Sequence, residues 1–160
     1  MSPPLCWQSG GDMPNNYAVL NEGSAVVEFW TGPVTHEELL AHERRHLSDP
    51  LIQAGASALV DAERAQFGTT VEQVKDIAAL YGQTIGRLKV GRMALLVNKE
   101  TYERALVFLK EVEGYGVKVI VFNSLDIACT WLGLDVNVAR KQLQALKAQS
   151  AQAGLSPAIS

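Results

Sequence analysis

The sharpest chemical motif in the chain is His42-Glu43-Arg44-Arg45-His46, which has the spacing H-E-x-x-H. Histidines at positions i and i+4 share one helix face, where they can hold zinc while the glutamate activates water. Glu63 or Glu72 is a candidate third ligand. Two arginines occupy the middle positions, and their charges oppose a dication by Coulomb repulsion. We therefore expect a surface helix with a charged face and no metal, and a zinc-dependent hydrolase using His42 and His46 is the alternative.

The remainder of the sequence has no recognisable catalytic set. It contains no G-x-S-x-G elbow, no phosphate-binding P-loop and no G-x-G-x-x-G motif. The two cysteines, Cys6 and Cys129, have no metal-ligand spacing and make no disulfide framework. We expect Cys129 to be a buried thiol on an apolar helix face. The sequence therefore favours a protein without enzymatic activity and without a cofactor.

A second candidate site is the stretch from Asp61 to Thr70. An apolar strand is expected to end at Asp61, and a polar loop leads through Phe67 and Gly68 to Thr69 and Thr70 at the head of an amphipathic helix. In open α/β sheets, binding sites lie at this carboxyl edge of the strands. The N–H groups and dipole of a helix start favour an anion, and a hydroxyl there suits phosphorylation, although simple capping is its commoner role. These five residues are the predicted ligand- or partner-binding set.

The elements that position both candidate sites alternate between strands and helices. Apolar runs predict strands at 17–20, 25–30, 56–61, 93–97 and 117–122. Helical spacing predicts helices at 35–47, 124–132 and 136–149, and two more with less certain bounds. Of these two, one begins at 69 or 70 and ends between 82 and 86, and the other begins at 98 or 101 and ends at 113. Thr35, with Glu38 three residues later, is a capping box for the first helix. This order predicts an α/β fold, a mixed sheet with an antiparallel N-terminal hairpin followed by parallel strands with alternating helices and an extra C-terminal helix.

Length and composition indicate one globular domain. The chain has 160 residues, of which 48% are hydrophobic and 19% charged. We expect a flexible tail over 1–14, an α/β domain over 15–133, a C-terminal helix over 134–150 and a flexible tail over 151–160. The apolar stripe of the final helix can cover either its own sheet or a second copy of the chain, and we favour a homodimer.

Charge and hydropathy exclude several classes of partner. The net charge is −3 and no cluster of Lys or Arg stands out, so we expect no nucleic-acid binding. No apolar run approaches the ~20 residues that span a bilayer. The first 17 residues have neither a basic start nor an apolar run, so we expect no signal peptide and a cytoplasmic protein.

From about Tyr17 to Leu132 the chain resembles the STAS fold of bacterial anti-sigma-factor antagonists, in particular the SpoIIAA-like, STAS/SEC14 group of small bacterial proteins. The resemblance rests on the run 58–61, on Phe67 six residues later with the capped helix after it, and on the closing stretch 119–132. In these antagonists a D-S-[ST]-G motif follows the phenylalanine, and a partner kinase phosphorylates its serine. The acid of that motif falls on Thr69, the serine on Thr70 and the glycine on Glu72. The resemblance therefore implies Thr70 as a phosphorylation site.

Two functions follow from the residues and the resemblance together. The first is a non-enzymatic regulatory or binding module that uses the Asp61–Thr70 loop, with an edge near Asn98 and Asn123, to bind a protein partner or a small anionic ligand. The second, implied by the SEC14 side of the resemblance, is a carrier of an apolar ligand. The large apolar residues that we expect around such a ligand, if they are not simply core, are Trp30, Phe67, Leu80, Tyr81 and Trp131.

Overall fold

The computed structural model describes residues 16–83 and 90–159, and of residues 153–159 it describes the helical backbone alone. In chain order the elements are β1 (Tyr17–Leu20), η1 (Asn21–Gly23), β2 (Ala25–Val34), α2 (His36–Leu47), β3 (Ala56–Phe67), α3 (Val74–Gly82), β4 (Val90–Val97), α4 (Tyr102–Glu113), β5 (Lys118–Phe122), α5 (Leu125–Leu132) and α6 (Val136–Ile159).

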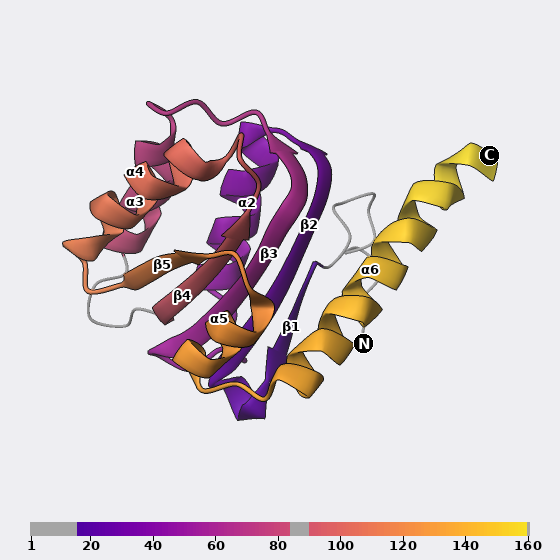
Figure 1. Cartoon of the computed structure of the whole chain (residues 1–160). Coiled ribbons are helices and arrows are strands. Elements are labelled where there is room, and N and C mark those ends of the chain that lie inside the picture. The colour runs from indigo at the N-terminus through magenta and orange to yellow at the C-terminus, as the bar shows by residue number, and fades with distance from the viewer. Residues whose placement is uncertain (1–15, 84–89, 160) are drawn as a thin grey trace.

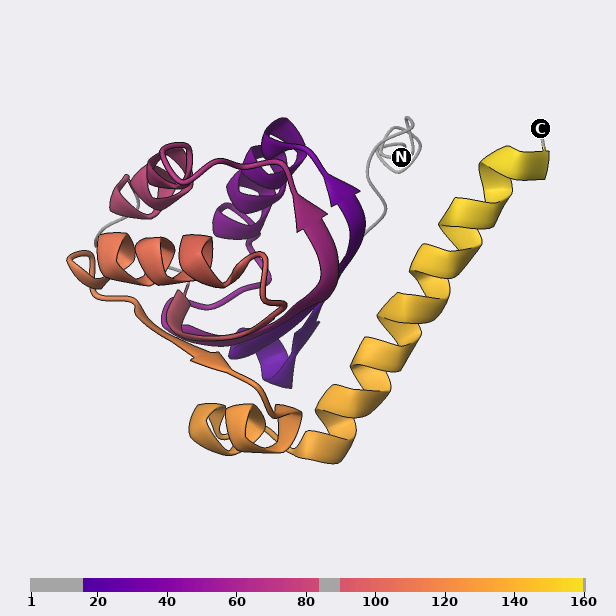
Figure 2. The ribbon, with the colours of Figure 1, turned by 45° about the horizontal axis from the view of Figure 1, so that its top comes forward.

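The fold is the expected mixed sheet between two layers of helices (Figure 1). Its strand order is β1-β2-β3-β4-β5, in which β1 is antiparallel to β2 and the later strands are parallel. Helices α2, α3 and α4 cover one face, and α5 and α6 lie on the other (Figure 2). The predicted antiparallel start, alternating helices and extra C-terminal helix are therefore confirmed.

Two strands are longer than the sequence predicts. The strand expected to stop at Trp30 continues through Gly32 and Pro33 as β2, and the strand expected to stop at Asp61 continues to Phe67 as β3. The extensions pair with each other after a register shift between Phe29 and Thr31. Proline is tolerated there because the pairing of β1 with β2 ends at Glu28, which leaves one side of β2 as a sheet edge.

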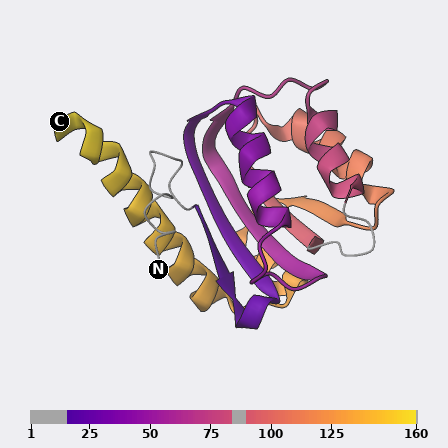
Figure 3. The ribbon, with the colours of Figure 1, turned by 180° about the vertical axis from the view of Figure 1, so that it is seen from behind.

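Each face of the sheet has its own core because side chains alternate between faces along a strand. Val60 and Ala62 of β3 belong to the core under α2, α3 and α4, whereas Leu59 belongs to the core under α5 and α6. The N-terminus of α2 has the predicted capping box, in which the Thr35 hydroxyl accepts from the Glu38 N–H and the Glu38 carboxylate accepts from the Thr35 N–H. Seen from behind, α2 crosses β2 and β3 (Figure 3).

The C-terminal helix differs from the expectation. It runs to Ile159 instead of ending near 150, because Ala and Gln at 151–153 continue a helix-forming sequence. Ala139, Leu143 and Leu146 of α6 are buried against the sheet. The expected tail at 1–14 and the stretch just after Gly82, where α3 was expected to end, fall largely outside the described residues. Among the described helices, none combines the length and apolar character needed to cross a membrane.

Candidate functional site

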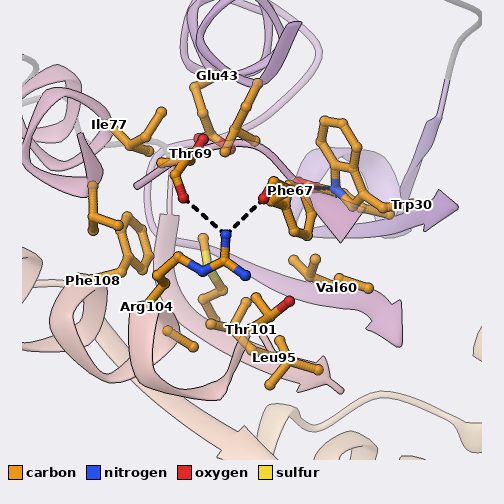
Figure 4. A pocket seen from close by; sticks show the side chains of 17 residues that line it. Trp30, Glu43, Val60, Phe67, Thr69, Ile77, Leu95, Thr101, Arg104 and Phe108 are labelled. Atoms are coloured by element: carbon orange, nitrogen blue, oxygen red, sulfur yellow. Dashed lines mark hydrogen bonds between the residues drawn. The ribbon is translucent and has the colours of Figure 1, made fainter. Parts of the chain in front are cut away.

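The main candidate site is a cavity of about 110 Å³ between the sheet and helices α2, α3 and α4, which we call the central cavity. The side chains that form its apolar wall include Trp30, Leu39, Val60, Phe67, Leu95 and Phe108. They come from all of the long strands β2–β4 and from two of the helices (Figure 4). An apolar, concave wall of this kind is typical of small-molecule sites.

A few polar groups interrupt this wall. Thr101 is 8% exposed, and its hydroxyl has no hydrogen-bond partner among the described residues. Arg104 projects from α4 and donates from Nη1 to the carbonyl oxygens of Phe67 (2.7 Å) and Thr69 (2.9 Å), and from Nη2 to that of Glu100 (3.1 Å) (Figure 4). Three of its five N–H groups thus have described acceptors, and two are left for another acceptor.

The loop of Phe67, Gly68, Thr69 and Thr70 forms one side of the central cavity, and its two threonines differ sharply. Thr69 is 4% exposed and lines the cavity, and its Oγ1 lies 3.0 Å from Nδ1 of His36. Thr70 is exposed, and its hydroxyl accepts from the N–H of Gln73 while the Gln73 side chain accepts from the N–H of Thr70. A kinase can therefore reach Thr70 but not Thr69, and Thr70 already serves as a cap for the turn before α3.

Asp61 lies apart from this loop. Because β3 does not end there, Asp61 is a mid-strand residue whose side chain faces α6, and it lines a second, polar hollow of about 350 Å³ together with Asn123 and Arg140. Its Oδ1 accepts from the N–H of Glu63 at 3.3 Å. The five predicted binding residues are thus divided between two faces of the sheet: Phe67 and Thr69 line the central cavity and Asp61 does not.

Asn98 and Asn123, which were expected to lie at one edge of the site, are also separated. Asn98 donates to the carbonyl oxygens of Glu63 and Ala65 and accepts from the N–H of Thr101, so it fixes the strand–helix connection next to the central cavity. Asn123 lies on the α6 side. Neither position links the two hollows.

A cluster of five ionisable side chains lies buried beside the central cavity; we call it the buried polar cluster and it comprises Glu28, His42, Glu43, His46 and Tyr81. His42 Nε2 lies 3.1 Å from Glu28 Oε1, and Glu43 Oε1 accepts from the Tyr81 hydroxyl at 2.6 Å. Glu28 Oε2 lies 3.5 Å from His46 Nδ1. Glu28 and Glu43 also line the central cavity.

Burial and neighbouring charges shift the pKa of four side chains in this cluster. Burial disfavours a charge on Glu28, but the attraction and hydrogen bond of His42 outweigh burial and lower the pKa of Glu28 to about 2. Burial also works against a charge on His42, yet the Glu28 carboxylate raises the pKa of that imidazole. Burial raises the pKa of Glu43, and burial together with the Glu43 carboxylate raises that of Tyr81. Glu28 and His42 therefore form a buried ion pair beside Glu43, whose pKa is shifted in the opposite direction from that of Glu28.

Helix α2 has the expected charged face, but the side chains of the H-E-x-x-H motif lie on its opposite, buried face. His42, Glu43 and His46 are buried, whereas Arg44 and Arg45 are exposed. The two arginines therefore extend away from the histidines, which weakens the Coulomb argument against a cation between them. The proposed third ligands were wrong, because Glu63 lies at the α6 hollow and Glu72 is exposed in the turn before α3.

Sequence reasoning missed three residues that the site depends on: Glu28, His36 and Arg104. Glu28 had a signal, because it is the one charged residue within the apolar run 25–30. His36 and Arg104 had none, since each follows the ordinary polar pattern of a helix.

The predicted apolar lining was partly right. Trp30 and Phe67 line the central cavity, and their rings are in edge contact at 5.7 Å. Tyr81 is fully buried against Glu43, and Leu80 packs against the same core. Trp131 lies on the α5 side, where it packs against Phe122. The expected buried thiol is confirmed, because Cys129 is 1% exposed and burial raises its pKa.

No family model matches the chain, and no curated protein matches it. A solved structure that matches it is the crystal structure of an uncharacterized protein from the DUF3478 family with a SpoIIAA-like fold, from Shewanella loihica PV-4. The identity is 18% and the TM-score 0.47, and the match covers 76% of this chain and 99% of that one.

Proposed function

We propose that this chain is a non-enzymatic binding module of STAS-like architecture that holds a small molecule in the central cavity. The observation that carries the proposal is the chemistry of the wall, which is apolar apart from a few polar groups. Among these, the Thr101 hydroxyl has no described partner and the Arg104 guanidinium has two N–H groups to spare. Such sparse polar groups orient a ligand within an apolar site.

The size and charge of the site favour a small amphipathic ligand with an anionic end. A cavity of about 110 Å³ is comparable to the ~150 Å³ cavity that accepts benzene in an engineered protein. A ligand of about one ring therefore fits, whereas the long acyl chains of a lipid do not. A carboxylate on that ring would pair with Arg104, since guanidinium and carboxylate make strong, charge-assisted hydrogen bonds.

Regulation through a protein partner is a further part of the proposal, and it concerns the same loop. Phe67 and Thr69 line the cavity while Thr70 is exposed one residue later. A bound ligand that moves Thr69 would also move Thr70. Recognition of this loop by a partner protein, phosphorylation of Thr70, a homodimer and a cytoplasmic location are predictions from the sequence and its resemblance.

Titration with two matched probes tests the binding proposal. Phenylacetate has one ring and a carboxylate, and toluene has the ring alone. We expect backbone amide signals of Phe67, Thr69 and Thr101 to shift in nuclear magnetic resonance spectra, with phenylacetate binding at least about 10-fold more tightly because of Arg104. Native mass spectrometry of the freshly purified chain tests for a molecule that co-purifies.

Two variants on α4 provide the contrast. Ala105→Leu fills the cavity from a residue that is 5% exposed, and we expect it to abolish binding of both probes. Leu106→Met changes the next residue, which is 36% exposed and lies outside the cavity, and it should bind as the original chain does. Circular dichroism establishes that both variants are folded. The proposal is wrong if neither probe binds and no small molecule co-purifies.

A further inference from the structure

Three side chains of the buried polar cluster have the arrangement of a metal-binding site. Glu28 comes from β2, and His42 and His46 come from successive turns of α2. One ligand atom from each lies within 4.8 Å of the other two, and all three residues are buried. Zinc bound tetrahedrally at the usual bond lengths of about 2.0–2.1 Å holds its ligand atoms about 3.3 Å apart. Here Glu28 Oε1 lies 3.1 Å from His42 Nε2 and Glu28 Oε2 lies 3.5 Å from His46 Nδ1, so each histidine faces a different oxygen of the same carboxylate. An ion would draw one of these oxygens and the two ring nitrogens together from separations of up to 4.8 Å.

Unpartnered polar atoms support a ligand at this point. Glu28 Oε2 and both ring nitrogens of His46 are buried without a hydrogen-bond partner in the described parts of the chain. Leaving such groups unpaired is costly, so each requires a partner of some kind. Glu28 Oε1 already accepts from the indole N–H of Trp30 and lies 3.1 Å from His42 Nε2, and His42 would release its proton on binding an ion. A cation between Glu28 Oε2 and His46 would satisfy both residues at once.

The surroundings suit a first-row divalent cation. Imidazole nitrogens favour zinc and its neighbours over calcium or magnesium, which prefer oxygen ligands. Glu43 lies close by, with Oε2 4.0 Å from His42 Nε2, so a second carboxylate can balance the charge of the ion. Aromatic rings enclose the site, since Tyr17 packs against both histidines and Trp30 packs against His42.

We propose that Glu28, His42 and His46 bind one divalent transition-metal ion, with zinc as the best fit, and that Glu43 lies at the fourth side of that ion. The ion would join β2 to α2 at the wall of the central cavity, because Glu28 and Glu43 line that cavity. The sequence motif alone could not supply this site, since its third ligand is 14 residues before His42. The proposal does not depend on the small-molecule ligand, because His42 and His46 are not among the cavity-lining residues.

The direct test uses the full chain purified without a histidine tag and stripped with a chelator. Zinc is added and its stoichiometry is measured by competition with a chromogenic chelator. We expect one equivalent to bind and Tm to rise by about 5–10 °C when free zinc is about 100 times its Kd. Because the chain has three histidines, ring ¹⁵N signals identify the ligands without any substitution. Signals of His42 and His46 should move while those of His36 stay in place.

Two substitutions and a matched control complete the test. Glu28→Gln and His46→Asn each remove one ligand, and each should weaken zinc binding more than about 100-fold, the upper range for losing an outer-shell partner. His36→Asn removes the third histidine, which begins the same helix but bonds to Thr69 and Asp76, so zinc affinity should not change. The absence of stoichiometric zinc binding by the original chain would overturn the proposal. So would shifts at His36 in place of His42 and His46, or loss of binding in His36→Asn.

Discussion

The two faces of the sheet are built in different ways. On the α2–α4 face the chain buries Glu28, His42, Glu43 and His46 beside an open cavity, and several of their polar atoms have no described partner. On the α5–α6 face the buried cluster is apolar, and the one buried charged side chain described there is Asp61, whose carboxylate accepts from the N–H of Glu63. Both faces hold the same strands, so the difference is not required by the fold. Unpaired polar groups and a cavity both reduce stability, and proteins keep them mainly where they serve a function.

The largest expected effect on stability comes from the polar face. Glu28→Ala should lower the free energy of unfolding by about 3–5 kcal/mol, because it leaves His42 buried without its partner carboxylate. Urea denaturation in the presence of a chelator measures this loss without any contribution from a metal ion. Glu111→Ala, which removes an exposed acid from α4, is the control and should change stability by less than about 0.5 kcal/mol.

A double replacement separates the cost of breaking the Glu28–His42 pair from the net contribution of that pair to the free energy of unfolding. Replacing Glu28 with Met and His42 with Leu removes both charges, and such changes are often neutral or stabilising. We expect this variant to recover most of the loss. If the double variant is as unstable as Glu28→Ala, the cluster contributes stability that an apolar core cannot replace. The buried polar groups of the α2–α4 face would then not reduce stability relative to the α5–α6 face.

The apolar face should respond to lost volume instead of lost charge. Leu143→Ala in α6 should cost about 2–5 kcal/mol, because Leu143 is 3% exposed in the core between α6 and the sheet. Val138 lies on the same helix and is 46% exposed, so Val138→Ala should have little effect. Equal effects of the two substitutions in thermal unfolding would mean that α6 does not pack against the sheet in solution.

The sequence predicted the elements that bury apolar side chains better than it predicted the buried polar cluster. Runs such as 93–97 and the stripe of Ala139, Leu143 and Leu146 predict strands and helices because burial alone determines them. The extension of β2 through Gly32 and Pro33 could not be predicted, since turn-forming residues there are overruled by pairing with β3. That extension is also why Asp61 lies mid-strand and faces away from Thr69.

The candidate site was predictable only in part. The H-E-x-x-H spacing identified three side chains of the buried polar cluster, but the orientation of α2 decides whether they meet solvent or the sheet. Glu28 joins them through a contact between separate elements, which local spacing cannot predict. Phe67 and Thr69, which the sequence predicted as binding residues, line the central cavity, and their binding role stays a prediction. Arg104, which bonds to the carbonyl oxygens of both residues from α4, has no distinguishing pattern in the sequence.

Two arginines provide the next comparison between the faces. Arg104 bonds to three backbone carbonyls at the central cavity, whereas Arg92 is exposed and donates to the carbonyl of Trp131 at 2.9 Å on the other face. Arg104→Met should cost about 1–3 kcal/mol, since hydrogen bonds from charged groups are the stronger ones. Arg92→Met should cost less than about 1 kcal/mol because solvent competes for its bond.

Hydrogen exchange locates the effect of Arg104. We expect the amide of Gly68, which donates to the carbonyl of Val34 at 2.8 Å, to exchange faster in Arg104→Met and to be unchanged in Arg92→Met. Unchanged exchange in Arg104→Met would mean that the loop keeps its conformation without the guanidinium, and Arg104 would then be available entirely for a ligand.

The smallest expected effects come from two hydroxyl caps, Thr70 at the turn before α3 and Ser124 at the start of α5. The Thr70 hydroxyl accepts from the N–H of Gln73 at 3.1 Å, and the Ser124 hydroxyl accepts from the N–H of Ile127 at 3.3 Å. Thr70→Ala and Ser124→Ala should each cost about 1 kcal/mol, because each leaves one N–H without its side-chain acceptor. Urea denaturation compares them directly. Since each hydroxyl accepts from the N–H three residues later, a change in phenylacetate binding in Thr70→Ala but not in Ser124→Ala would assign Thr70 a role beyond capping, at the loop that borders the central cavity.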